Sequence, residues 1–272
     1  MEKLRLNDAK LTAQLNQLDE EANRRGLELA PLLVGWYNQS LEDKSYAFDY
    51  PENTLALVAI SNPSFFRTSF MAYLRSSHLD SSSDLFDECM RVTVNNLLAA
   101  TVPKETVKVI YDFDIDAETF RPGFLAQVGA HASGIARCYR QPDLDQEGIK
   151  AYQDLNGGSQ EEFKAYPVCL HPRHGGWFGI RCLIILEGVK VDASLMSQPD
   201  PPTVLTSQTD IAKVLYRYNN HWADNTWRNV GVNVKDKYSD AQKEYFAQMP
   251  DQRSDQFVKG ILDKLEKEIQ SL

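Results

Sequence analysis

The chain has 272 residues, of which 43% are hydrophobic and 25% charged, and its formal net charge at pH 7 is -9. This composition is typical of a globular protein, and the length suits one large domain or two small ones. An acidic chain repels phosphate backbones, which argues against nucleic acid as a partner. Apolar runs such as residues 182–186 are too short to span a bilayer, and we expect no secretory signal.

The chain has four cysteines, and none of them forms a C-x-x-C pair: Cys89, Cys138, Cys169 and Cys182. In a chain of this size the pattern is typical of free thiols in a reducing compartment, not of a disulfide framework. We therefore expect a cytoplasmic protein that does not associate with membranes.

The first half of the chain alternates between helical and strand-like patterns. Apolar spacing predicts helices over residues 4–22, ended by Gly26, and over 29–39. A strand is expected at 54–60, helices at 65–75 and 84–100, and a strand at 107–115 with Val109, Tyr111 and Phe113 on one face. Pro122 favours a helix from 122 to about 139, since proline suits a first helical turn.

The second half begins with an apolar stretch, residues 163–188, that reads as two strands paired around a Gly-Gly turn. A polar loop at 197–202, a helix at 211–222 and a short helix capped by Ser239 follow. Apolar residues at spacing four predict an amphipathic helix over 254–272. Strands and helices mix without a regular βαβ order, which favours a single α+β domain over residues 1–272.

The segment 122–139 contains many small residues. Gly129 and Gly134 lie inside the predicted helix, where each costs about 1 kcal/mol relative to alanine. A helix with such small side chains would let a large flat ligand approach its backbone. Close packing against another helix or a sheet is the simpler explanation of the small residues. His131 alone would be read as a buried core histidine.

Arg181 lies within an apolar strand. Period-two alternation puts Trp177, Gly179, Arg181, Leu183 and Ile185 on one face, and Phe178, Ile180, Cys182, Ile184 and Leu186 on the other. Both faces are apolar, so the strand should be buried, and a buried guanidinium requires an anion. That anion is either an internal Asp or Glu, or the carboxylate or phosphate of a ligand.

No standard motif identifies a reaction. Cys169, His171 and His174 match no zinc spacing and lack a fourth ligand, and nucleotide-binding and hydrolase fingerprints are absent. The residues by themselves therefore indicate an α+β protein with a candidate anion site.

Five blocks, in order, resemble the cblC (MMACHC) family of cobalamin-processing proteins. They are GWYNQ at 35–39, FLAQVGAHASG at 124–134, HPRHGGWFGIR at 171–181 with Cys169 two residues before it, NNHWADNTWRN at 219–229 and YSDAQKEYFAQMPDQR at 238–253. The resemblance covers roughly residues 28–253, leaving 254–272 as a C-terminal amphipathic helix.

The resemblance implies a fold and an activity. The fold would be a single α+β domain related to flavin reductases and nitroreductases, with an antiparallel sheet flanked by helices. The protein would bind cobalamin with its dimethylbenzimidazole displaced and remove the upper ligand. Cyanocobalamin would lose cyanide to electrons from reduced FMN or FAD, with NADPH as their source, and methyl- and adenosylcobalamin would pass their alkyl group to glutathione. The cblD (MMADHC) protein would be a partner of a monomer or weak dimer.

The resemblance also implies site residues. Arg181, Arg228 and Arg253 match three arginines that hold glutathione. Those matching cobalamin contacts are Asp112, Phe124, Leu125, Ala126, Gln127, His131, Gly134, Cys138, Tyr139, Arg140, Cys169 and Ile180. His131 and Gly134 repeat the H-x-x-G of cobalamin mutases, but Gly129 replaces the preceding aspartate, so we expect His131 to shape the pocket and not to ligate cobalt. We expect no metal site made by protein side chains, and no protein acid or base in the displacement.

Several positions depart from vertebrate members of the family. His174 replaces a Phe, Cys182 a Gly, and Cys138 and Arg140 a Tyr and a Gln, and an amphipathic helix replaces a Pro/Ser-rich tail. From Cys138, Cys182 and His174 we hypothesise weaker shielding of reduced cobalt, and hence a side activity that oxidises glutathione. Two alternatives remain: a cobalamin chaperone without turnover, and a flavin reductase or nitroreductase for which cobalamin is incidental.

Overall fold

The computed structural model describes residues 8–76, 84–102, 107–159, 163–192 and 194–270. Its centre is an antiparallel sheet of four strands in the order β1-β2-β6-β3. These strands are β1 (Leu27–Leu33), β2 (Thr54–Ser61), β6 (Gly179–Lys190) and β3 (Val107–Tyr111). A separate antiparallel ladder joins β4 (Arg137–Tyr139) to β5 (Val168–Leu170).

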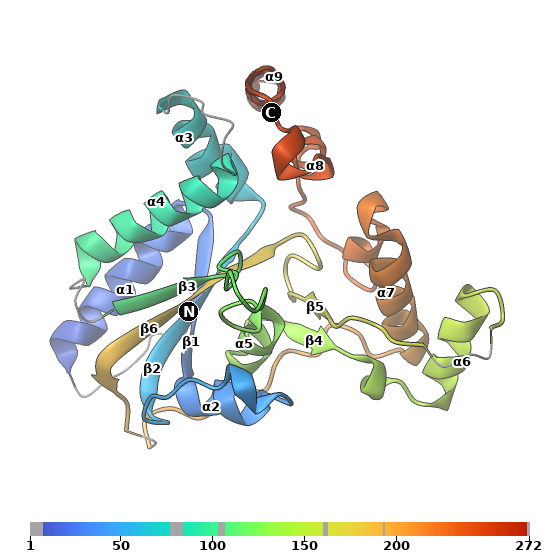
Figure 1. Cartoon of the computed structure of the whole chain (residues 1–272), viewed down its shortest axis with the longest axis horizontal. Helices are drawn as coiled ribbons and strands as arrows, with labels where there is room; N and C mark the ends of the chain where they lie inside the picture. Colours follow the sequence, from blue (N-terminus) through green and yellow to red (C-terminus); the bar gives the residue numbers. More distant parts are fainter. Residues whose placement is uncertain (1–7, 77–83, 103–106, 160–162, 193, 271–272) are drawn as a thin grey trace.

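Helices cover both faces of the sheet (Figure 1). The helices of the described residues are α1 (Ala9–Arg24), α2 (Val34–Ser40), α3 (Met71–Ser76), α4 (Leu85–Thr101), α5 (Ala126–Ala132), α6 (Gln146–Leu155), α7 (Gln208–His221), α8 (Asp240–Ala247) and α9 (Asp255–Gln270), of which α6 and α7 lie beside the β4–β5 ladder. The starts of α4 and α8 follow from their caps, because the side chains of Asp84 and Ser239 accept hydrogen bonds from backbone N–H groups of the first turn. A π-helical turn, Phe66–Phe70, precedes α3.

Two apolar layers form on the sheet. One face, here called the α4 face, packs residues such as Leu57 and Ile184 against α1, α4, α8 and α9. The other, the α5 face, packs Val58 and Leu183 against α2 and α5. A third cluster lies between the β4–β5 ladder, α6 and α7, on the right of Figure 1. The expected single α+β domain with a flanked antiparallel sheet is thus the observed architecture, while kinship to flavin reductases stays a prediction.

The prediction of a helix over residues 29–39 is wrong in its first half. Residues up to Leu33 form β1, and the helix α2 begins only at Val34. The run LELAPLL is apolar almost throughout, so its spacing does not separate a strand buried on both faces from a buried helix. Pro31 is compatible with the strand because β1 lies at the edge of the sheet, where one side of the ladder needs no N–H donors.

The predicted helix over 122–139 is also too long. The helix α5 spans Ala126–Ala132 only, and residues 137–139 form β4. Gly134 takes a φ of 73°, a left-handed conformation that ends a helix, and a Cβ there would lie 2.7 Å from Pro199. The small residues therefore serve a short helix and a tight exit from it.

The expected pairing within 163–188 does not occur. Both strands exist, but β5 pairs with β4, while β6 pairs with β2 and β3. Between them, His171 and Gly175 exchange two backbone hydrogen bonds of 2.8 Å, so the chain makes a local turn that redirects it to the large sheet.

A β-bulge at Arg181 changes the predicted faces of β6. Ala59 pairs with Cys182 and Ile60 with Ile180, so Arg181 is an extra residue between them. Ile180 therefore lies on the α5 face with Leu183, although alternation had put these two on opposite faces. Arg181 turns to the α4 face, where its guanidinium lies 4.8 Å from the ring centre of Phe86.

The other elements agree with the sequence. The strand at 54–60, the helices at 65–75, 84–100 and 211–222, the loop at 197–202 and the helix capped by Ser239 are confirmed. Helix α1 matches the predicted first helix, whose beginning lies outside the described residues, and β3 ends at Tyr111 instead of residue 115. Helix α6 was not anticipated. Among the described residues, no helix has the length and apolarity required to cross a membrane.

The C-terminal helix α9 packs onto the domain. Val258, Ile261 and Leu265 are buried in the cluster on the α4 face, and α9 lies beside α8 at the top of Figure 1. The apolar face of this amphipathic helix is therefore part of the hydrophobic core.

We predict that Leu265→Ala lowers the free energy of unfolding by about 2–5 kcal/mol, because it removes a fully buried side chain and leaves a cavity. Ile269→Ala, four residues along the same helix but with an exposed side chain, should change it by less than about 0.5 kcal/mol. Urea denaturation measures both, and equal effects would contradict the packing of α9.

Candidate functional site

Two adjacent cavities flank the first turn of α5. The α5 cavity, of about 200 Å³, is lined by Ser40, Gln127, Val128, His131, Cys138 and Arg140. The ladder cavity, of about 130 Å³, is lined by Gln127, Pro167, Val168, Cys169, Gly176, Phe178, Ile180, Tyr218 and Trp227. Gln127 belongs to both. Six of the predicted cobalamin contacts therefore gather at one place, although they come from α5, β4, β5, β6 and the residue after β4.

His131 has a defined proton position. Its Nδ1 accepts a hydrogen bond of 3.2 Å from the backbone N–H of Cys138. Burial and the charges of Arg137 and Arg140 lower the pKa of His131, so the neutral ring is favoured. Because Nδ1 is the acceptor, the ring proton of the neutral form is on Nε2.

The other predicted cobalamin contacts lie elsewhere. Phe124 is 1% exposed and packs beneath Gly129, and the hydroxyl of Tyr139 accepts from the amides of Val204 and Leu205 at 3.0 and 2.6 Å. Leu125 and Ala126 enter α5 and are partly buried on the α5 face. Gly134 lines a different, larger cavity. Asp112 pairs with an arginine.

Arg181 has an internal anion. Its Nη1 lies 3.6 Å from Oδ2 of Asp112, and its Nε donates to Oγ of Ser61 at 2.7 Å. The other oxygen of Asp112, Oδ1, is buried and has no hydrogen-bond partner among the described residues. The ion pair expected as one alternative is therefore present, but its geometry is loose and leaves hydrogen-bonding capacity on both partners.

Arg228 has a different environment. Its guanidinium lies 4.4 to 5.5 Å from the ring centres of Trp227, Tyr238 and Trp177. It donates to Oδ1 of Asn225 at 2.8 Å and to the carbonyl of Gly176, and no carboxylate of the described residues lies within ion-pair distance of it. Burial lowers the pKa of Arg228, and Arg181 lowers it further. Within the described ranges, Arg228 is therefore a cation surrounded by aromatic rings and without an anionic partner.

The third arginine, Arg253, completes a cluster of charges. Its Nη1 lies 2.8 Å from Oδ2 of Asp84, and its guanidinium 4.3 Å from the ring centre of Tyr245. Burial and the charges of Asp84 and Asp112 raise the pKa of Asp87 to about 7. The positive charges of Arg181 and Arg253 oppose that rise. The three arginines that resemble glutathione contacts are thus neighbours, with carboxylates interspersed.

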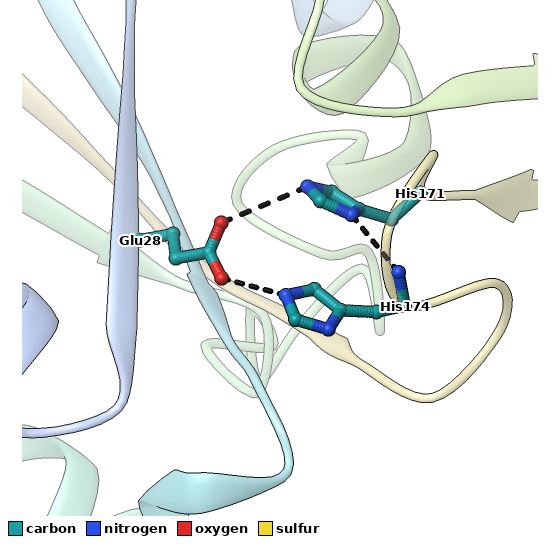
Figure 2. Close-up of side chains that lie close together, drawn as sticks. All are labelled: Glu28, His171 and His174. Carbon is teal, nitrogen blue, oxygen red and sulfur yellow. Dashed lines mark hydrogen bonds and ion pairs between the residues drawn. The ribbon is translucent and has the colours of Figure 1, made fainter. Parts of the chain in front are cut away.

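Glu28, which sequence reasoning overlooked, holds a buried network together with His171 and His174 (Figure 2). Its Oε1 lies 2.7 Å from Nε2 of His174, and its Oε2 lies 3.7 Å from Nε2 of His171 and contacts the guanidinium of Arg173. Burial alone would raise the pKa of Glu28, but hydrogen bonds from His174 and Asn62 and the histidine charges lower it to about 2. Burial and the neighbouring charges of His174 and Arg173 lower the pKa of His171 to about 4.

Two histidines and a carboxylate are a ligand set that many divalent metals accept, and these donor atoms lie within 4.8 Å of one another. The hydrogen bonds argue against that use. Nδ1 of His171 accepts from the backbone N–H groups of Arg173 and His174 at 3.1 and 3.2 Å, so its proton is on Nε2, which faces Glu28 (Figure 2). A metal would need the lone pair of that atom, and metal-bound histidines usually donate from the other nitrogen. The cluster is therefore an ion-pair network.

A third cavity, of about 670 Å³, lies beside this network. It is lined by residues of α1, β1, the turn after α5, the 171–173 segment and residues 195–199. Glu28, His171 and Arg173 contribute its charged wall. No pattern in the sequence indicates it, because its walls come from five separate segments.

The cysteines differ in their access to these cavities. Cys182 is fully buried on the α4 face and burial raises the pKa of its thiol, so it offers no thiol to a ligand near Ile180. His174 is engaged with Glu28. Of the three residues behind the hypothesis of glutathione oxidation, only Cys138 lines the site.

The chain is similar to a family and to several curated proteins. Residues 26–257 match the family described as "Methylmalonic aciduria and homocystinuria type C family". A Danio rerio protein named cyanocobalamin reductase / alkylcobalamin dealkylase is 34% identical over 88% of this chain and 90% of its own. The Homo sapiens protein of the same name is 31% identical over 84% of this chain and 75% of its own.

A solved structure shares the fold. It is that of a Caenorhabditis elegans B12-trafficking protein CblC, which matches with a TM-score of 0.75 and 22% identity over 94% of this chain and 97% of its own. The architecture described above is therefore one that has been observed experimentally.

We predict that acid weakens the fold through the Glu28 network. The pKa values of His171 and Glu28 are lower in the folded chain than in the unfolded chain, so the unfolded chain binds protons at a pH where the folded chain does not. This window runs from pH 6.5 to about 4 for His171 and from pH 4.5 to about 2 for Glu28. The free energy of unfolding should fall as the pH falls through both windows. Denaturant titrations at a series of pH values measure it.

Glu28→Gln should lower the free energy of unfolding at pH 7 by about 3 kcal/mol and flatten its pH dependence below pH 4.5, since the titrating carboxylate is gone. Glu118→Gln, at an exposed position, is the control and should leave both unchanged. An acid branch of unaltered slope in Glu28→Gln would refute the assignment.

Proposed function

The chain belongs to the methylmalonic aciduria and homocystinuria type C family, and from this premise we propose that it is an enzyme that removes the upper axial ligand of cobalamin. The observation that carries the proposal is the convergence of Gln127, His131, Cys138, Arg140, Cys169 and Ile180 on two adjoining cavities. Each cavity is smaller than a corrin ring, so the ring would lie across their shared rim at Gln127. Amide groups of the ring edge would then enter the cavities.

The proton position of His131 supports binding without a protein ligand on cobalt. Its Nδ1 is used by the Cys138 amide, so Nε2 carries a proton and has no lone pair to offer a metal. In the proposed complex the dimethylbenzimidazole is displaced and His131 donates a hydrogen bond from Nε2. Cobalt that is bound on its lower face by neither dimethylbenzimidazole nor a histidine best accepts a low oxidation state.

We propose that glutathione removes alkyl groups. Its thiolate attacks the alkyl carbon, a carbon–sulfur bond forms, the cobalt–carbon bond breaks, and the electron pair remains on cobalt as cob(I)alamin. Glutathione has two carboxylates, and Arg228, which has no anionic partner among the described residues, lies next to Trp227, a residue that lines the ladder cavity. Arg181 and Arg253 are adjacent cations whose partners, Asp112 and Asp84, could share them. Fixing the thiolate near the reacting carbon supplies much of the acceleration.

The remaining activities follow from the same premise and are proposals of the same kind. Cyanocobalamin would lose cyanide when reduced FMN or FAD delivers electrons to cobalt at the open rim. NADPH would be the source of the electrons that reduce the flavin. The cblD (MMADHC) protein would receive the product, in the cytoplasm, from a monomer or weak dimer. The proposed side activity, in which oxygen oxidises glutathione through the bound cobalamin, now rests on Cys138 alone.

A cobalamin chaperone without turnover is the main alternative. A carrier needs the two cavities but has no use for an arginine that is surrounded by three aromatic rings and has no carboxylate partner in the described part of the chain. Arg228 therefore separates the two functions.

We predict that Arg228→Gln lowers kcat/KM for glutathione-dependent demethylation of methylcobalamin by about 10- to 100-fold, the loss expected for a charge-assisted hydrogen bond. The Kd for methylcobalamin should stay within about 2-fold, and the fold should be retained, because no carboxylate of the described residues loses its partner.

Arg24→Gln, which alters an exposed arginine of α1, is the control and should behave as the parent protein. An unchanged rate in Arg228→Gln, measured by anaerobic absorbance, would remove Arg228 from the thiol site. Loss of cobalamin binding in parallel with the rate would place it in the corrin site instead.

A further inference from the structure

Cys138 and Cys169 face each other across the β4–β5 ladder. They are direct partners in the antiparallel register, between the pairs Arg137–Leu170 and Tyr139–Val168. Side chains directly opposite in such a ladder have Cβ atoms about 4.5–5.5 Å apart and lie on the same face. The thiol of Cys169 donates to the carbonyl of Gln127 at 3.8 Å, and hydrogen bonding with the Cys138 side chain is the first cause of the raised pKa of Cys169.

This pairing suits a disulfide. Opposite residues of an antiparallel pair have Cα atoms about 4.5–5.5 Å apart, within the range of about 4.4–6.8 Å that disulfides span. The Cβ atoms must approach by a further fraction of an ångström. A ladder of three residue pairs, outside the large sheet, can make that adjustment.

Both thiols also meet a cavity. Cys138 lines the α5 cavity and Cys169 the ladder cavity, so the pair forms part of the wall between them. Cys89 and Cys182 differ, since both are buried in the cluster on the α4 face. Sequence reasoning treats Cys138 and Cys169 only as separate ligand contacts, because 30 positions between them hide the register that joins them.

We propose that Cys138 and Cys169 are a redox-active dithiol that closes to a disulfide by exchange with small disulfides of the glutathione type. The Cys138 thiolate attacks the small disulfide and releases one thiolate, leaving a mixed disulfide on Cys138. Cys169 gives its proton to the released thiolate and attacks the Cys138 sulfur, and the second small thiolate leaves and takes up from water the proton that Cys138 had lost. Two protein thiols are oxidised and one small disulfide is reduced to two thiols, so atoms and electrons balance.

The assignment of roles follows from the surroundings. Hydrogen bonding with the Cys138 side chain and burial hold the pKa of Cys169 well above its usual range, so Cys169 keeps its proton until the mixed disulfide forms. A bond across so short a ladder should be easily reduced, as strained disulfides are, which suits a reversible couple. The proposal depends on the two cavities and not on the identity of the ligand that occupies them.

The test equilibrates the full chain, without cobalamin, in mixtures of glutathione and glutathione disulfide, followed by acid quenching, unfolding and alkylation of the remaining thiols. Peptide mass spectrometry should show a Cys138–Cys169 linked pair lighter by two hydrogen atoms. Alkylation of both cysteines should fall together by about tenfold as the mixture becomes more oxidising, while Cys89 and Cys182 stay fully alkylated.

Two variants make the result specific. Cys138→Ser should abolish the linked pair, whereas Cys89→Ser, which alters a thiol of the core, should leave it unchanged. The proposal is overturned if Cys138 and Cys169 remain alkylated at every ratio, or if Cys138 carries glutathione without ever linking to Cys169. Neither result bears on Arg228 or on cobalamin binding, so it is separable from failure of the proposed function.

Discussion

The turn at residues 171–176 is the constraint on which the two halves of the site depend. At its start, His171 and His174 are fixed by the buried carboxylate of Glu28 on β1. At its end, the N–H of Gly176 donates to the carbonyl of Arg228 at 3.0 Å, and a Cβ on Gly176 would lie 2.5 Å from the ring of Trp227. One short turn therefore sets the distance between the sheet, the caged arginine and the wall of the ladder cavity.

Strand β6 continues this arrangement. The bulge places Ile180 on the α5 face, at the ladder cavity, and turns the next residue, Arg181, to the α4 face beside Asp112. Without the extra residue, both side chains would keep the strict alternation of a strand, and an arginine would face α5. The apolar and the charged parts of the proposed site are thus separated by one irregularity in hydrogen bonding.

Features set by nearby residues could be predicted from the sequence. Asp84 and Ser239 cap helices whose apolar spacing is clear, and Leu265 is one of the regularly spaced apolar residues on the buried face of α9. Features set by distant partners could not. Glu28 and His174 are 146 positions apart in the sequence. The strands β4 and β5 pair although the helix α6 lies between them in the chain. The bulge at Arg181 is defined only by the register of β6 with β2.

The resemblance to a known family compensated for part of this, since it brought together residues of α5, β4, β5 and β6 that no periodicity links. It did not distinguish side chains at the cavities, such as Gln127, from those beneath them, such as Phe124. It also matches Asp112 to a cobalamin contact, which stays a prediction, and it gives no sign of the ion pair that Asp112 forms with Arg181. Burial, which decides between these roles, depends on the whole fold.

The most direct measurement is an anaerobic absorbance titration of methylcobalamin with the full chain, followed by glutathione. The account predicts a shift to the spectrum of cobalamin without its lower ligand, and then growth of cob(I)alamin when the thiol is added. A spectrum that does not change on adding the protein would contradict the claim that these two cavities receive cobalamin.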